Sequence, residues 1–97
     1  MREFTHGDAV AAASALRTRP SETWEGWLAG YLDRAHAADR FRKRTGKVHP
    51  RWGNGSLMSA ILCDMPVWPE PRLSDPDYAE AMVAALEALI RWRRRIS

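Results

Sequence analysis

The chain has 97 residues, of which 45% are apolar, and a formal net charge of +3. This length indicates one small domain over residues 1–97, and this apolar content excludes a disordered protein. The sequence contains no signal-peptide core, no apolar run of membrane-spanning length and only one cysteine, so we expect a cytoplasmic protein that makes no membrane contact.

The first predicted helix covers residues 8–17. Thr5 and Asp8 have the spacing of a capping box, in which a hydroxyl and a carboxylate satisfy free amides at a helix start. The alanine-rich stretch that follows has high helix propensity, and Pro20 should stop it. Its apolar face is narrow and consists of Val10, Ala13 and Leu16.

The second predicted helix begins after an N-cap at Ser21 and ends near Gly46. Gly26 and Gly30 would permit the close approach of another helix. Apolar residues recur along it at spacings of three and four, which is typical of one buried helix face. These residues are Trp24, Trp27, Leu28, Tyr31, Leu32, Ala35 and Ala38.

Two charged residues, Asp39 and Arg42, interrupt this apolar stripe. They form a buried ion pair, or they mark the point at which the helix leaves the core and projects into water. A buried carboxylate needs a partner, and we favour the second interpretation.

Glycine, proline and asparagine predict a loop over residues 45–55. Ser56 should cap a short third helix that Pro66 ends. The predicted buried residues of this helix are Leu57, Met58, Ile61, Leu62 and Met65.

Three prolines within residues 66–73 predict a stiff, extended connection. Asp75 followed by Pro76 is a strong signal for the start of a fourth helix. Its predicted inward residues are Tyr78, Met82, Leu86, Leu89 and Ile90. No strand pattern competes, so we predict an all-α fold: a compact four-helix domain with one short helix and a proline-rich connecting loop.

Positive charge is concentrated in two windows. Residues 40–51 contain six basic side chains and no acid, and residues 91–95 contain four arginines and no acid. Because these ten charges exceed the net charge of +3, the rest of the chain carries −7. Dense positive charge attracts phosphate or carboxylate surfaces, and Phe41 or Trp52 could stack on bases. Alternatively, both clusters only complement the dipoles at helix ends.

The loop offers two further features. Asn54-Gly55-Ser56 before a helix is compatible with an anion-binding nest of backbone amides, although an ordinary turn followed by an N-cap is the favoured interpretation. Trp52 and Trp68 lie in predicted loops, where a tryptophan serves either as an interface anchor or as a cover for a small core.

Catalytic chemistry has little support in the sequence. The three histidines and Cys63 lack zinc-ligand spacing, and Ser56 and Ser59 lack the context of a nucleophile elbow. Asp33 and His36 share a helix face, but such a pair is common. We therefore expect a protein without enzymatic activity, cofactor or metal.

Three segments, Thr5-His6-Gly7-Asp8, residues 49–58 and residues 71–78, resemble a family of short uncharacterised alphaproteobacterial proteins. The resemblance covers nearly the whole chain and implies a free-standing domain, but it implies no activity.

The sequence thus predicts a small binding or regulatory module whose two basic helix ends meet on one surface. Its partner is nucleic-acid backbone bound without strong sequence preference, or alternatively an acidic protein; the sequence sets no oligomeric state. The candidate anion-binding residues are Arg40, Arg42, Lys43, Arg44, Lys47, His49, Arg51, Trp52, Asn54, Arg91, Arg94 and Arg95.

Overall fold

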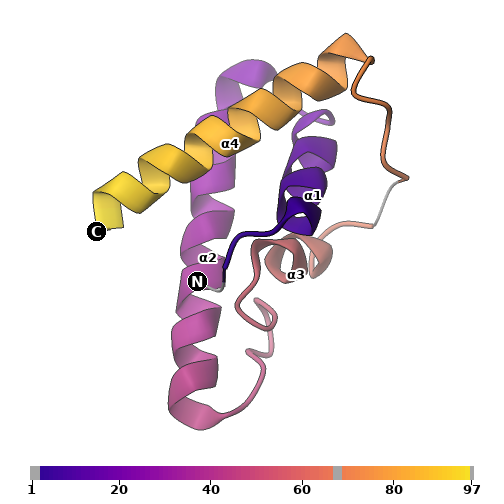
Figure 1. The fold of residues 1–97 in the computed structure, drawn as a ribbon. Coiled ribbons are helices and arrows are strands. Elements are labelled where there is room, and N and C mark those ends of the chain that lie inside the picture. The colour runs from indigo at the N-terminus through magenta and orange to yellow at the C-terminus, as the bar shows by residue number, and fades with distance from the viewer. Residues whose placement is uncertain (1–2, 67–68, 97) are drawn as a thin grey trace.

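The computed structural model describes residues 3–66 and 69–96. Four helices follow one another: α1 (His6–Leu16), α2 (Trp24–Thr45), α3 (Leu57–Leu62) and α4 (Pro76–Ile96), with a 3₁₀ turn, η1 (Ser21–Thr23), before α2. The described residues contain no strand, which confirms the predicted all-α fold. α1 and α2 lie side by side, α4 crosses both, and the short α3 packs at the start of α1 (Figure 1).

The core is built around α1. The predicted capping box is present, since the Thr5 side chain accepts from the Asp8 amide and Asp8 accepts from the Thr5 amide. The apolar face of α1 is wider than the sequence pattern indicated, because most of its alanines are buried between α3 and α4. Alanine lets neighbouring helices approach closely on several sides, so a helix with little amphipathicity can still be central.

The start of α2 differs from the prediction. Ser21 begins the turn η1, α2 starts at Trp24, and no side chain caps it. The apolar stripe is confirmed from Leu28 to Ala38, whereas Trp24 and Trp27 are only half-buried at the edge of the core. The expected close approach at Gly26 and Gly30 is wrong, since a Cβ at either position would meet nothing within 4 Å.

The α3 prediction is partly confirmed. Ser56 is its N-cap and accepts a hydrogen bond from the Ser59 amide, and Leu57 and Ile61 are buried. Met58 and Leu62, predicted to be buried, are 39% and 38% exposed. The helix ends at Leu62, before the predicted stop at Pro66.

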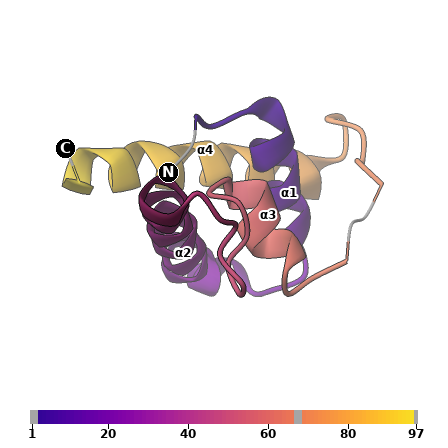
Figure 2. The ribbon, with the colours of Figure 1, turned by 90° about the horizontal axis from the view of Figure 1, so that it is seen from below.

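α4 begins at Pro76 as predicted, and the Asp75 carboxylate accepts from the amides of residues 77 and 78. Its buried face is rotated from the predicted one. Tyr78 and Leu89 are buried and Met82 partly so, but Leu86 and Ile90 are 44% and 49% exposed. The remaining buried positions are Ala81, Ala85, Ala88 and Trp92. Small side chains face the core because α4 crosses closely over α1 and α2 (Figure 2).

This rotation gives a stability test with matched leucines. Leu89→Ala removes a buried side chain and should lower the free energy of unfolding by about 2 kcal/mol or more. Leu86→Ala alters an exposed side chain and should change it by about 0.5 kcal/mol or less. Urea unfolding at low protein concentration measures both values. Equal losses from the two substitutions would contradict the assigned face.

Candidate anion-binding surface

The basic window of residues 40–51 begins where α2 leaves the core. Residues up to Asp39 include buried positions, whereas the side chains from Arg40 to Val48 are exposed or half-exposed. The last turns of α2 extend beyond α1 and α4, with only the loop that leads to α3 beside them (Figure 1). The sequence pattern therefore located this projecting helix end correctly.

Asp39 corrects the favoured interpretation that its helix turn projects into water. Its side chain is 1% exposed, and its two oxygens contact Arg42 Nη2 at 2.9 Å and Lys43 Nζ at 3.0 Å. Burial raises the pKa of this carboxyl. The hydrogen bonds from Lys43 and Arg42 are the largest of the effects that lower it, and together these effects bring the pKa from 3.8 to about 2. Asp39 is therefore an ionised, buried anchor for two of the predicted anion-binding cations.

The same ion pair fastens the loop to the helix. Arg42 Nε donates to the Asn54 carbonyl oxygen at 3.1 Å. Gly55 lies directly over Asp39, since a Cβ at position 55 would be 2.8 Å from the Asp39 Cα, and its φ of +102° is one that glycine adopts at little cost. The loop thus packs on α2 through backbone contact that requires the absence of a side chain.

An aromatic cluster holds the first half of the loop. His49 Nδ1 accepts from the amides of Arg51 and Trp52, each at 3.1 Å. The imidazole stacks on the Trp52 ring with centroids 4.7 Å apart and an interplanar angle of 5°, and its edge contacts Phe41 at 5.1 Å. His49 and Trp52 therefore hold the loop in its conformation. The His49 ring covers one face of Trp52.

The anion nest, which was the less favoured interpretation of Asn54-Gly55-Ser56, is not open to an external ion, because groups of the protein itself occupy it. The Asn54 amide donates to Ser59 Oγ, and the Asn54 side-chain oxygen accepts from the Ser56 amide. Ser56 is an ordinary N-cap, which confirms the favoured interpretation of this segment. Asn54 positions the loop and leaves little capacity to bind an external anion.

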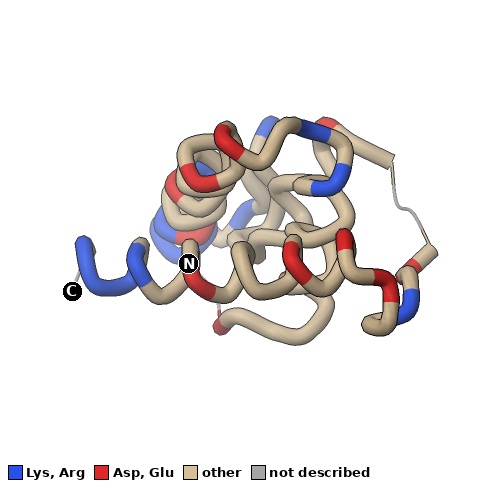
Figure 3. The backbone as a smooth tube through the Cα atoms, turned by 90° about the horizontal axis from the view of Figure 1, so that it is seen from above, with Lys and Arg blue, Asp and Glu red and all other residues tan. Residues whose placement is uncertain are grey.

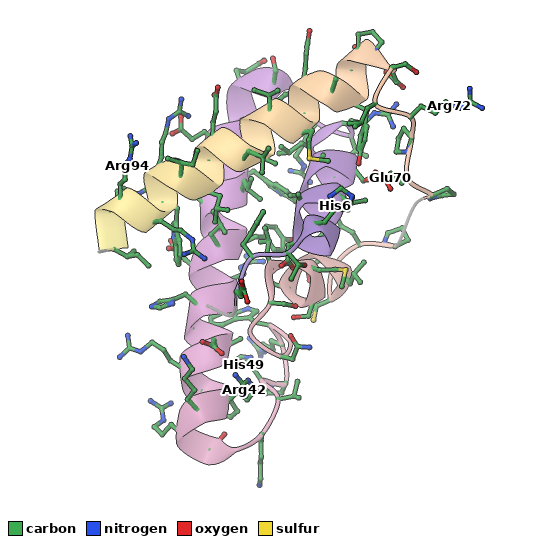
Figure 4. All side chains as sticks on the ribbon, in the orientation of Figure 1. His6, Arg42, His49, Glu70, Arg72 and Arg94 are labelled. Atoms are coloured by element: carbon green, nitrogen blue, oxygen red, sulfur yellow. The ribbon has the colours of Figure 1, made fainter. Side chains whose placement is uncertain are left out.

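Four cations of the window remain open to solvent. The side chains of Arg40, Arg44, Lys47 and Arg51 are exposed, and none of them forms an ion pair with a carboxylate in the part of the chain that the structure describes. Figure 4 shows His49 and Arg42 together at the lower end of α2, where these cations are carried on the same helix turns and loop.

The C-terminal arginines form a second, separate patch. Trp92 Nε1 donates to Asp33 at 2.8 Å, which fixes the point where α4 crosses α2. Beyond this crossing the two helices diverge, so that Arg94 lies at a different corner from Arg42 (Figure 4). Arg91 pairs with Glu25 at 3.3 Å and Glu87 at 3.6 Å. The two basic windows are therefore not joined into the single surface expected from the sequence.

The other chemically interesting side chains have structural contacts. Asp33 accepts from Trp92, and the His36 ring packs edge-on against Trp92 at 5.4 Å. Among residues 3–66 and 69–96 no group of three or more potential ligands could hold a metal ion, and no helix there is long and apolar enough to cross a membrane. Cys63 is exposed. Trp68, a candidate interface anchor, lies outside the described residues.

The sequence analysis did not identify the packing role of three residues that position the loop: Gly53, Gly55 and Ser59. Gly53 packs on Ser59, where a Cβ at position 53 would be 2.5 Å from the hydroxyl oxygen. The available signal was the density of glycine next to a serine-capped helix. Which α2 residue lies beneath the loop is a long-range contact that the local pattern does not encode.

The chain was compared with known families, proteins and structures. Residues 2–89 match the family described as Domain of unknown function (DUF7742). The chain belongs to this family. The match contains the whole basic window of residues 40–51 and stops before the arginines of residues 91–95. No curated protein and no solved structure matches the chain.

The buried Asp39 carboxylate gives a pH-dependent prediction. Its folded pKa of about 2 lies below its ordinary 3.8, so the stability it adds is present above about pH 4 and is lost as the pH falls toward 2. Asp39→Asn should cost about 2 kcal/mol at pH 7 and should cost progressively less at lower pH. Urea unfolding of both proteins between pH 7 and 2 measures the difference. A constant difference over this range would contradict the ion-pair assignment.

Alanine should have opposite effects on stability at two glycines, one in the contact between the loop and α2 and one outside it. Gly55→Ala forces a Cβ against Asp39 at a positive φ and should destabilise the protein by more than about 1 kcal/mol. Gly26→Ala lies within α2, where a Cβ meets nothing within 4 Å, and should stabilise it by about 0.5–1 kcal/mol. Thermal unfolding followed by circular dichroism measures both, and tolerance of alanine at position 55 would refute the packed loop.

Proposed function

We propose that this protein is a small, non-enzymatic binding module that contacts nucleic-acid backbone through the projecting end of α2. The observation that carries the proposal is the set of four exposed cations, Arg40, Arg44, Lys47 and Arg51, gathered on one helix end and its loop without carboxylate partners among the described residues. Phosphates attract such a group strongly at long range, since the charges reinforce one another.

The surface suits phosphate better than base edges. α3 has only six residues, and its sequence, Leu-Met-Ser-Ala-Ile-Leu, lacks the arginine, asparagine and glutamine side chains that commonly distinguish bases. The cations instead lie on α2 and its loop, where guanidinium and ammonium groups can follow phosphate oxygens. We therefore expect little sequence preference.

The arrangement of the aromatic residues also favours contact with the phosphate backbone over contact with bases. Trp52 is half-buried and stacks on His49, so the aromatic cluster orders the loop and offers a restricted platform for a base. A duplex, which presents continuous phosphates and stacked bases, is the expected ligand form. Single-stranded binding would require the uncovered face of Trp52.

Salt titration tests this function. Four phosphate contacts predict that the logarithm of the duplex association constant falls with the logarithm of salt concentration at a slope of about −4. The triple variant Arg40→Ala, Arg44→Ala, Lys47→Ala should reduce this slope to about −1. Fluorescence anisotropy with a labelled duplex at several salt concentrations measures it. Arg42 and Lys43 are left intact, since they hold the buried Asp39.

Arg72→Ala is the matched control, because it removes a cation on the far side of the molecule (Figure 4) and should leave the slope unchanged. Arg94→Ala tests the second basic patch separately. Absence of duplex binding at low salt, or equal effects of Arg72→Ala and the triple variant, would refute nucleic-acid binding at this surface.

A second candidate is an acidic protein partner. The observation that favours it is Val48, which is 60% exposed in the middle of the basic window. An apolar side chain among cations fits a protein interface better than a phosphate backbone. If the duplex experiment fails, Val48→Ser and the triple cation variant should both weaken capture of an acidic protein.

A bacterial, cytoplasmic setting belongs to the same proposal. Nucleic acid is abundant there, and a chain with one exposed cysteine is suited to a reducing compartment. The alphaproteobacterial affiliation remains a prediction from the three resembling segments.

A further inference from the structure

The outward face of α4 carries an apolar stripe that is left exposed by the described residues, 3–66 and 69–96. Val83, Leu86 and Ile90 are 56%, 44% and 49% exposed. Their spacing of three and four places them along one line of the helix, on the side away from the buried residues Ala81, Ala85 and Ala88. A shallow hollow lined by Ala79, Glu80, Val83, Ala84 and Glu87 lies beside the stripe and shares Val83 with it.

The charges of α4 are divided between its two halves. Residues 76–87 contain Asp77, Glu80 and Glu87 and no basic residue, whereas residues 88–96 contain four arginines and no acid. Figure 3 shows the acids along the first half of α4 and Lys or Arg at its C-terminal end. Such a helix repels a parallel copy of itself and attracts an antiparallel one.

We propose that the apolar stripe of α4 docks on the same stripe of a second copy of this chain, with the two helices antiparallel. A two-fold axis between Glu87 and Ala88 brings Leu86 of one copy close to Ile90 of the other. The same axis brings Glu80 next to Arg94 of the second copy, and symmetry repeats both contacts. Glu80 and Arg94 are exposed and form no ion pair with the residues that the structure describes, so they are available for this role.

One repulsive contact must be offset in this arrangement. The two Glu87 carboxylates approach each other at the axis, where like charges oppose pairing. Arg91 lies 3.6 Å from Glu87 in the same chain and provides a compensating cation for each carboxylate. The helix pair is therefore close to neutral at its centre and attractive toward both ends.

Charge reversal tests the pairing. Sedimentation equilibrium of the full chain should show a reversible dimer. Glu80→Arg or Arg94→Glu alone should raise its dissociation constant about tenfold, since each turns two attractive contacts into repulsive ones. The double variant Glu80→Arg, Arg94→Glu should restore the wild-type value, and both effects should shrink at high salt.

Ile90→Glu should abolish the dimer, because it places two carboxylates in the apolar contact. Leu73→Glu is the matched control, since Leu73 is 62% exposed and lies outside α4; it should leave the dimer intact. Circular dichroism confirms that each variant is folded. A wild-type protein that stays monomeric at about 1 mM, or a dimer that survives Ile90→Glu, would overturn the proposal. A dimer would bind a duplex through two α2 ends, so the duplex-binding test is made at a protein concentration below the dimer's dissociation constant. Failure of either proposal is then seen separately.

Discussion

The basic surface of this protein depends on a buried acid. A carboxylate removed from water is costly unless charged partners satisfy it. Asp39 has two such partners, Arg42 and Lys43, on the next turn of its own helix. Arg42 then extends the arrangement to the loop by donating to the Asn54 carbonyl. One buried charge thus holds two cations and, through Arg42, the loop, and it reduces the repulsion among the six clustered positive charges.

Much of the fold follows from local signals in the sequence. Three helix starts are capped by residues a few positions away in the sequence, so they can be predicted without knowledge of the tertiary structure. The capping residues are Thr5 and Asp8 for α1, Ser56 for α3, and Asp75, followed by Pro76, for α4. Asp8 also makes a contact with a residue that is distant in sequence. Its other carboxylate oxygen accepts from the Met58 amide at 2.8 Å and joins the starts of α1 and α3, which no short pattern could indicate.

The orientation of α4 and the burial of Asp39 could not be predicted in this way. Hydrophobicity favours the large residues Leu86 and Ile90 as the inward ones, but the close crossing of α4 over α1 and α2 selects Ala81 and Ala85 because they are small. Similarly, Asp39 is buried by Gly55, sixteen positions later in the chain. In both cases the residues that determine burial are distant in sequence. The local pattern therefore predicted the helix correctly and the burial of its side chains incorrectly.

The two basic windows are physically different despite their similar composition. The window at the end of α2 is anchored by Asp39 and the loop, and it falls within the residues matched by the family. The arginines of α4 lie beyond that match, opposite an acidic half of the same helix, which gives them an electrostatic partner in an antiparallel copy. If α4 pairs in this way, a dimer carries two α2 surfaces at a fixed separation. Binding of a long polyanion then gains from effective concentration, so a modest set of four exposed cations per chain would be sufficient for stable attachment.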